Sequence, residues 1–204
     1  MFNSCNKITT FTSDLSSLTD GEGMFYGCYN LIAFNSDLSS LTNGYVMFAE
    51  SGIVDFDNVS LSSLTSGSGM FQYCEKLTSF TSDMGSLENG YCMFYYCTAL
   101  TDFNADLSSL KFGYGMFYNC TALTSFTSDL PSLTDGDMMF CGSNLTSFNA
   151  DLSSLTDGTH MFYGCSALSD FTSDMSSLTD GSSMFSYCTN LTTFASDLSS
   201  LTNG

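Results

Sequence analysis

The chain has 204 residues, of which 43% are hydrophobic and 15% aromatic, and its formal net charge is −18. Three lysines and no arginine leave little to neutralise phosphates, which argues against a nucleic-acid partner and against binding to an anionic membrane surface. The apolar content is sufficient for a buried core, and no apolar run approaches the length of a membrane span. The composition therefore predicts a folded protein without membrane insertion.

A Met-Phe pair recurs along the whole chain. The pairs begin at Met1, Met24, Met47, Met70, Met93, Met116, Met139, Met161 and Met184. The row that they define reads M-F-x-x-C-x-x-L-x-x-F-x-S-D-L-S-S-L-T-(D/N)-G-x-x. A unit of this size cannot bury its own apolar side, but stacked units can share a continuous core. The pattern predicts one solenoid domain over residues 1–204, built from nine 23-residue repeats without capping repeats.

Two repeats depart from the period. Repeat seven lacks one residue between Phe140 and Leu145. Repeat three lacks one between Phe48 and Ile53 and regains one before Leu61. Because the apolar positions stay intact, these changes indicate surface bends rather than core strands.

Within a repeat, the pattern predicts three elements in chain order. M-F-x-x-C predicts a short turn or a strand-like side, and L-x-x-F-x-S predicts a strand, as at residues 123–128. D-L-S-S-L predicts a bend or one 3₁₀ turn with the aspartate as its cap, and the glycine that follows predicts a residue with positive φ. The expected fold is a mainly β, right-handed solenoid with one short parallel strand per coil and both phenylalanine columns inside.

The rows resemble the BspA-like leucine-rich repeats of bacterial surface proteins. The resemblance rests on M-F-Y-N-C-T-A-L-T-S-F at 116–126 and M-F-Y-G-C-S-A-L-S-D-F at 161–171, each followed by a turn of the L-S-S-L type. It covers the whole chain, although Phe stands where many members have Ile or Leu. It implies an extracellular or cell-surface location, a role in adhesion or protein binding, and no shared catalytic residues or cofactor.

One aspartate column raises the question of a metal site. The column runs through Asp14, Asp37, Asp83, Asp106, Asp129, Asp151, Asp174 and Asp197. Stacked like charges repel unless they are compensated. Caps on the following serine N–H groups would suffice, so no metal site is expected; Ca²⁺ held by Asp83, Asp106, Asp129, Asp151 and Asp174 is the alternative. A second column that includes Asp20 and Asn43 is interpreted as a turn column.

The other candidate groups are thiols and one histidine. A cysteine column contains Cys5, Cys28, Cys74, Cys97, Cys120, Cys165 and Cys188, whereas Cys92 and Cys141 lie outside it. Buried thiols are favoured over disulfides, because successive members of one column cannot all pair. His160 precedes a Met-Phe pair and is interpreted as a surface residue, so no catalytic site is expected.

A tyrosine column offers a contact surface. Tyr26, Tyr95, Tyr118 and Tyr163 each follow a Met-Phe pair. Tyrosines in a row suit contact with a protein or a sugar. The sequence thus predicts a non-catalytic surface protein that binds a protein or glycan partner. Further copies of the chain stacked end to end are the other expected partner, since apolar columns reach both ends. The alternative is a purely structural filament or stalk without a specific ligand.

Overall fold

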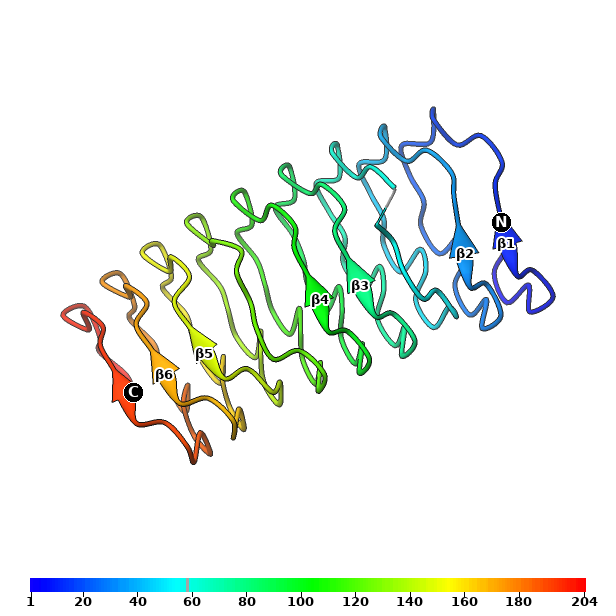
Figure 1. Cartoon of the computed structure of the whole chain (residues 1–204). Coiled ribbons are helices and arrows are strands. Elements are labelled where there is room, and N and C mark those ends of the chain that lie inside the picture. Colours follow the sequence, from blue (N-terminus) through cyan, green and yellow to red (C-terminus); the bar gives the residue numbers. More distant parts are fainter. Residues whose placement is uncertain (58) are drawn as a thin grey trace.

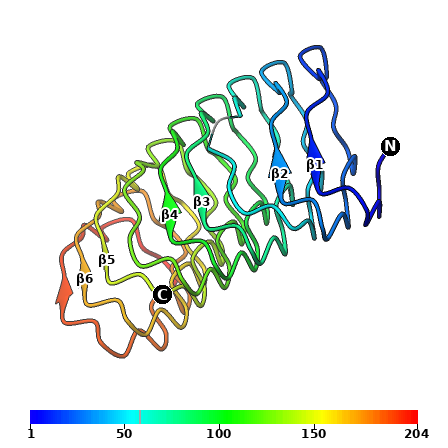
Figure 2. The ribbon, with the colours of Figure 1, turned by 45° about the vertical axis from the view of Figure 1, so that its right-hand side comes forward.

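The computed structural model describes residues 1–57 and 59–204, which form one elongated stack of coils with the two ends of the chain far apart (Figure 1). Seven of the nine repeats carry a two-residue strand: β1 (Thr10–Phe11), β2 (Ala33–Phe34), β3 (Ser79–Phe80), β4 (Asp102–Phe103), β5 (Ser147–Phe148), β6 (Asp170–Phe171) and β7 (Thr193–Phe194). Repeats three and six have no strand among the described residues, so the expectation of one strand per coil is wrong for these two. All strand pairs are parallel, in the groups β1-β2, β3-β4 and β5-β6-β7. Figure 2 shows the labelled strands following one another along one side. The leucine-rich-repeat-like solenoid is confirmed.

The strands are shorter than the six residues that the sequence predicts. In repeat four, the Leu77 N–H donates to the Cys74 carbonyl at 3.0 Å, which makes a turn just before β3. Three residues after Phe80, the Asp83 carboxylate accepts the Gly85 N–H at 3.0 Å and makes a second turn. A coil of only 23 residues must bend on both sides of the phenylalanine, so little extended backbone remains.

The Met-Phe side of each coil is a chain of turns bonded to the next coil. Phe25 donates its N–H to the Met47 carbonyl of the next repeat at 2.8 Å, whereas Met24 donates to Gly21 within its own turn at 3.0 Å. Two positions of each turn chain hold positive φ, the residue before Met and the residue before Cys, as at His160 (φ 52). The expected second turn is confirmed, and it satisfies backbone groups locally and between coils.

The glycine after the Asp/Asn column does not hold positive φ, which corrects the sequence-based expectation. Gly44 and Gly67 are absent from the positive-φ positions. A Cβ atom on Gly44 would lie 2.7 Å from Met70 Sδ, and one on Gly67 would lie 2.8 Å from Met93 Sδ. Glycine fits there because a methionine of the neighbouring coil packs directly on the backbone.

The core consists of two interleaved phenylalanine columns. Phe103 stacks on Phe80 and Phe126 at ring-centroid distances of 5.8 Å each, and it meets Phe117 edge-on at 4.8 Å. Offset stacking and edge-to-face packing are the favourable arrangements of aromatic rings. Leucine, methionine and cysteine columns surround the rings and are buried with them. Both predicted phenylalanine columns are therefore inside.

Hydroxyl side chains add a further ladder between coils. Thr42 donates its hydroxyl to the Thr19 carbonyl at 2.9 Å, and Thr179 donates to Thr156 at 2.9 Å. At the same position of repeats four and five, Glu88 and Lys111 instead form an ion pair at 3.1 Å. No helix within residues 1–57 and 59–204 is long and apolar enough to cross a membrane.

Candidate contact surface

Six tyrosines gather on the turn side of repeats four to six, and we call them the tyrosine face. They are Tyr73, Tyr91, Tyr95, Tyr96, Tyr114 and Tyr118. Tyr95 stacks on Tyr118 at 4.8 Å, and both rings lie near Tyr96, at 4.8 and 5.7 Å. The rings are supported by the turn chain beneath them, so they form a preordered aromatic surface.

Two of the four sequence-predicted tyrosines lie apart from this face. Tyr26 is in repeat two, where its hydroxyl donates to Glu50 Oε1 at 2.8 Å. Tyr163 lies beyond repeat six, edge-on to Tyr187 at 5.1 Å and to His160 at 5.6 Å. Only Tyr95 and Tyr118 are brought together as the column predicted, because other residues occupy the column in the repeats between them and the outer two.

Four members of the tyrosine face lie outside the predicted column. Tyr73 and Tyr96 stand one residue further along the turn, with φ of 58° each. Tyr91 and Tyr114 follow the turn glycine and stack at 4.6 Å. The signal that could have found them is local: most of the tyrosines of the chain fall between residues 73 and 118. The tyrosine face is built from three columns of the repeat, so the single column that follows Met-Phe predicts only two of its six members.

The phenols of Tyr95, Tyr114 and Tyr118 are protonated at neutral pH. Burial, together with the neighbouring tyrosines, raises the pKa of Tyr95 to about 12. Burial also raises the pKa of Tyr118 and of Tyr114. The hydroxyl groups are therefore hydrogen-bond donors and acceptors without charge. Tyr73 and Tyr91 keep 40% and 47% of their surface exposed, so a partner can reach the face.

The aspartate column caps turns, as the sequence predicts. The Ser108 N–H donates to Asp106 Oδ1 at 2.9 Å, and the same bond joins Ser176 to Asp174 at 2.9 Å. It recurs at Asp14, Asp37, Asp83, Asp151 and Asp197. This bond lowers the pKa of Asp106. No group of three metal-ligating side chains occurs within the described part of the chain.

Asp129 is the exception in this column. The residue two positions later is Pro131, which has no N–H to donate. Asp129 Oδ1 instead accepts the N–H of Asp151 from the next repeat at 3.3 Å. The second column behaves as the predicted turn column: the Tyr45 N–H donates to Asn43 Oδ1 at 3.2 Å, and the same pattern recurs at Asp20, Asn89, Asp135, Asp157 and Asp180.

All nine cysteines are free thiols, and the column cysteines other than Cys5 hydrogen-bond to the backbone. Cys120 Sγ lies 3.2 Å from the carbonyl oxygen of Phe94 in the preceding repeat, and Cys97 makes the same bond to Phe71 at 3.1 Å. Ser51 takes the column position in repeat three and Ser143 in repeat seven, where each hydroxyl lies 3.4 Å from the next cysteine sulfur. The expected buried thiols are confirmed for the central members of the column.

His160 is more enclosed than a surface residue. Its side chain is 35% exposed, and Nδ1 lies 4.0 Å from Asp137 Oδ1. Burial raises the pKa of Asp137, and the nearby Asp157 and Asp135 raise it further. The imidazole borders a small hollow of about 240 Å³ with Tyr118, Met138, Cys141 and Tyr163. The interpretation of His160 as a plain surface residue was incomplete, because Tyr163, three residues further along the chain, packs edge-on against its ring.

Comparison with known proteins places this geometry in a family. Residues 1–124 and 88–203 match the family described as "BspA type Leucine rich repeat region (6 copies)". The chain belongs to the BspA-type leucine-rich repeat family. The Met-Phe rows on which the resemblance rests are thus confirmed as repeats of this type. No curated protein matches this BspA-type chain.

Two solved structures are similar to it. A leucine rich cell surface protein from Faecalibacterium prausnitzii A2-165 is 22% identical with a TM-score of 0.50, and the match covers 96% of this chain and 61% of that one. The BspA-type chain thus spans less than two thirds of the length of that protein, and the likeness shows the fold alone. A leucine-rich repeat protein from Bacteroides ovatus ATCC 8483 is 19% identical with a TM-score of 0.37, over 98% of this chain and 76% of that one.

Proposed function

We propose that this chain is a non-catalytic, extracellular or cell-surface repeat protein that serves adhesion by binding a protein or glycan partner through the tyrosine face. Its BspA-type repeats support this proposal, and the similar Faecalibacterium prausnitzii protein is described as a cell surface protein. The observation that carries the proposal is the stacked cluster around Tyr95 and Tyr118. Exposed aromatic rings held on a rigid scaffold bury large area at little entropic cost when a partner binds.

The use of the other polar groups supports a non-catalytic role. The carboxylates of the aspartate column accept backbone N–H groups, as Asp106 does from Ser108. The column thiols donate to carbonyl groups, as Cys120 does to Phe94. Groups that recur along the stack in these roles serve the fold, whereas the tyrosine face is confined to repeats four to six and is available for recognition.

A binding panel tests the proposal. The purified chain is applied to arrays of glycans and of extracellular-matrix proteins, and any ligand found is titrated against the variant that carries both Tyr95→Ser and Tyr118→Ser. We expect this variant to lose at least tenfold in affinity, since aromatic anchors at a contact are worth about 2 kcal/mol or more. The control is Tyr45→Ser, an exposed tyrosine outside the face (46% exposed). Unchanged binding by the double variant would refute a role for the face.

The second candidate function is a filament or longer array made by coils stacking end to end. Its support is the exposed apolar surface of the last coil, where Phe194 is 43% exposed beside a hollow of about 520 Å³ bordered by Phe185 and Leu198. A heterologous contact between such faces propagates into a fibre. Light scattering at micromolar concentration tests it: growing particles support assembly, and a stable 22.1 kDa monomer contradicts it.

A further inference from the structure

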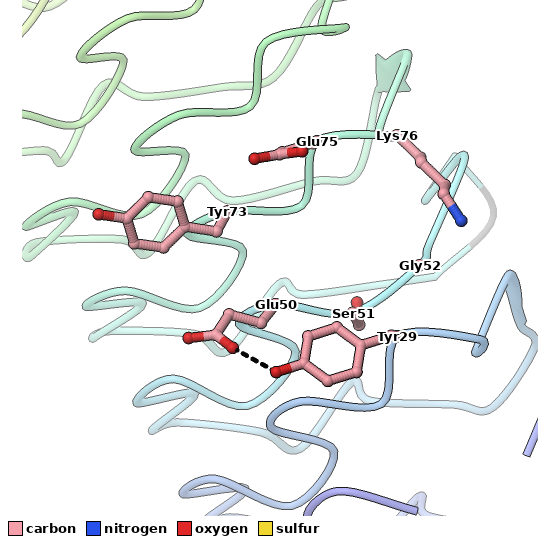
Figure 3. A pocket seen from close by; sticks show the side chains of 7 residues that line it. All are labelled: Tyr29, Glu50, Ser51, Gly52, Tyr73, Glu75 and Lys76. Atoms are coloured by element: carbon pink, nitrogen blue, oxygen red, sulfur yellow. Dashed lines mark hydrogen bonds between the residues drawn. The ribbon is translucent and has the colours of Figure 1, made fainter. Parts of the chain in front are cut away.

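A hollow of about 430 Å³ opens beside repeat three, and its walls come from repeats two and four (Figure 3). The lining residues are Tyr29, Glu50, Ser51, Gly52, Tyr73, Glu75 and Lys76. In Figure 3, Tyr29 and Glu50 lie on one side of the hollow, and Tyr73 and Glu75 lie on the other. Two aromatic rings and two carboxylates therefore border one space.

The hollow lies where repeat three lacks one residue. Between Ser51 and Ile53 stands only Gly52, whereas repeat four has Glu75 and Lys76 at the matching place. A Cβ atom on Gly52 would overlap the carbonyl oxygen of Tyr29, so the shortened chain runs directly against repeat two. The side chain that would fill the row in a full-length repeat is absent, which leaves room between the neighbouring coils.

Repeat seven has the same deletion but not the same lining. There, Ser143 and Asn144 precede Leu145. The residues that match Tyr29 and Glu75 in the flanking repeats are Thr121 and Ser166, which have neither a ring nor a carboxylate. The deletion alone thus does not account for the chemistry beside repeat three.

Hydrogen bonds hold one of the carboxylates in place. Tyr29 donates its hydroxyl to Glu50 Oε2 at 2.9 Å, and Tyr26 donates to Oε1 at 2.8 Å. The bond to the Glu50 carboxylate raises the pKa of Tyr29, so the phenol remains a donor at neutral pH. The ring of Tyr29 is 53% exposed and that of Tyr73 is 40% exposed, which leaves aromatic surface free to contact a ligand.

Neither Glu50 nor Glu75 forms an ion pair within the described chain. The two ion pairs among residues 1–57 and 59–204 join Lys111 to Glu88 and His160 to Asp137. Lys76 borders the hollow, but its side chain extends away from Tyr73 and Glu75 (Figure 3). Two carboxylates beside exposed rings, on a chain with a net charge of −18, favour a cation.

We propose that this hollow binds the guanidinium group of an arginine side chain presented by a partner protein. A planar guanidinium stacks on tyrosine rings and pairs with carboxylates through its fork of N–H donors, whereas an ammonium ion acts as a point charge. The negative field of the whole chain would steer a basic partner toward this side. The hollow shares Tyr73 with the tyrosine face, but Tyr29, Glu50 and Glu75 lie outside the face, so carboxylate variants test the hollow separately.

A titration of the whole chain tests this inference. The chain is labelled with ¹³C in its tyrosine rings and titrated by NMR with N-acetyl-arginine amide. The neutral isostere N-acetyl-citrulline amide, N-acetyl-lysine amide and glucose are titrated in parallel. We expect saturable shifts of the Tyr29 and Tyr73 signals with the arginine probe, a weaker response to lysine, and none to citrulline or glucose. Saturation by citrulline or glucose, or none by arginine up to about 100 mM, would overturn the inference.

Matched carboxylate variants separate a site from general attraction. Glu75→Gln, which removes one charge from the hollow, should weaken the arginine affinity about fivefold, the value of one exposed ion pair. Glu50→Gln should do the same and should also shift the Tyr29 signal, because Tyr29 bonds to Glu50. Glu88→Gln, remote from the hollow, should change the affinity less than twofold. Equal effects of Glu75→Gln and Glu88→Gln would overturn the inference; thermal melting of each variant shows that it is folded.

Discussion

Gly90 and Met116 pack against each other across successive coils: a Cβ atom on Gly90 would lie 2.8 Å from Met116 Sδ. The Gly90 N–H also donates to the Phe112 carbonyl at 2.9 Å, so the backbone cannot move away without losing a bond between coils. The same contact between a glycine and a methionine recurs along the stack. It explains why glycine occupies this column although φ is not positive there. It makes the glycine column a packing element of the core.

Gly90→Ala should therefore destabilise the protein by about 1–3 kcal/mol, the usual cost of overpacking. Urea denaturation measures the free energy of unfolding. Combining Gly90→Ala with Met116→Val should recover part of the loss, with a coupling of about 0.5 kcal/mol or more. Strict additivity of the two changes would contradict direct contact. Gly23→Ala is the control, because φ is 55° there and no atom lies within 4 Å of the added Cβ, so only backbone strain applies.

Phe103→Ala should cost about 3–5 kcal/mol, because it opens a cavity in both phenylalanine columns. Phe103 contacts four other rings, including Phe117 at 4.8 Å. The control is Phe112→Ala, whose ring is 48% exposed in the turn column and which should cost about 0.5 kcal/mol or less. The comparison uses urea denaturation curves. If both variants lost the same free energy of unfolding, the column that contains Phe103 would not be part of the buried core.

Asp106→Ala should cost about 1 kcal/mol through loss of the cap on Ser108, and Asp129→Ala should cost less because Pro131 leaves no N–H to cap. Thermal melting at pH 7 measures both. The bond to Ser108 lowers the pKa of Asp106 below 3.8, so its contribution is present above that pH and is lost as the pH falls further. The difference in stability between Asp106→Ala and the unchanged chain should therefore become smaller in acid. A larger effect at Asp129 would show that the column acts through something other than capping.

Alkaline pH should destabilise the chain through its buried thiols. Burial raises the pKa of Cys74 to about 11 and that of Cys165 to about 12, from an ordinary value of 9.0. A raised pKa in the folded state contributes stability that is present below pH 9 and is lost as the pH rises toward these values. The urea midpoint should fall over this range, and Cys74→Ser should make the fall shallower, since serine naturally occupies this column at Ser51. If the urea midpoint of Cys74→Ser fell with pH as steeply as that of the unchanged chain, ionisation of the Cys74 thiol would not be the cause.

The melting temperature should not depend on Ca²⁺. The carboxylates of Asp83 and Asp106 already accept backbone N–H groups, so they need no cation to compensate them. Differential scanning calorimetry with millimolar Ca²⁺, with equal Mg²⁺ as the control for ionic strength, measures this. A strong rise with Ca²⁺ alone would make the column a metal site.

The repetition in the sequence is enough to determine the solenoid and its core. Phenylalanine recurs at one position of every row, as at Phe80 and Phe103. These side chains can be buried only if the rows stack in register. The caps on Asp106 and Asn43 also follow from local spacing, because the donor lies two residues further along the same chain. Features that depend on neighbours along the chain were therefore predictable.

Only the tertiary structure decided which side chains from different columns come together. Tyr73 and Tyr95 come from two columns and meet at a ring-centroid distance of 5.6 Å, and Tyr91 and Tyr114 of a third column stack at 4.6 Å on the same turn chain. The hollow beside Gly52 likewise needs a deletion in one coil and the rings of the two coils around it. A column in the sequence shows which residues lie above one another in successive coils. It does not show which columns lie side by side within a coil, because the path of the backbone through its turns decides that.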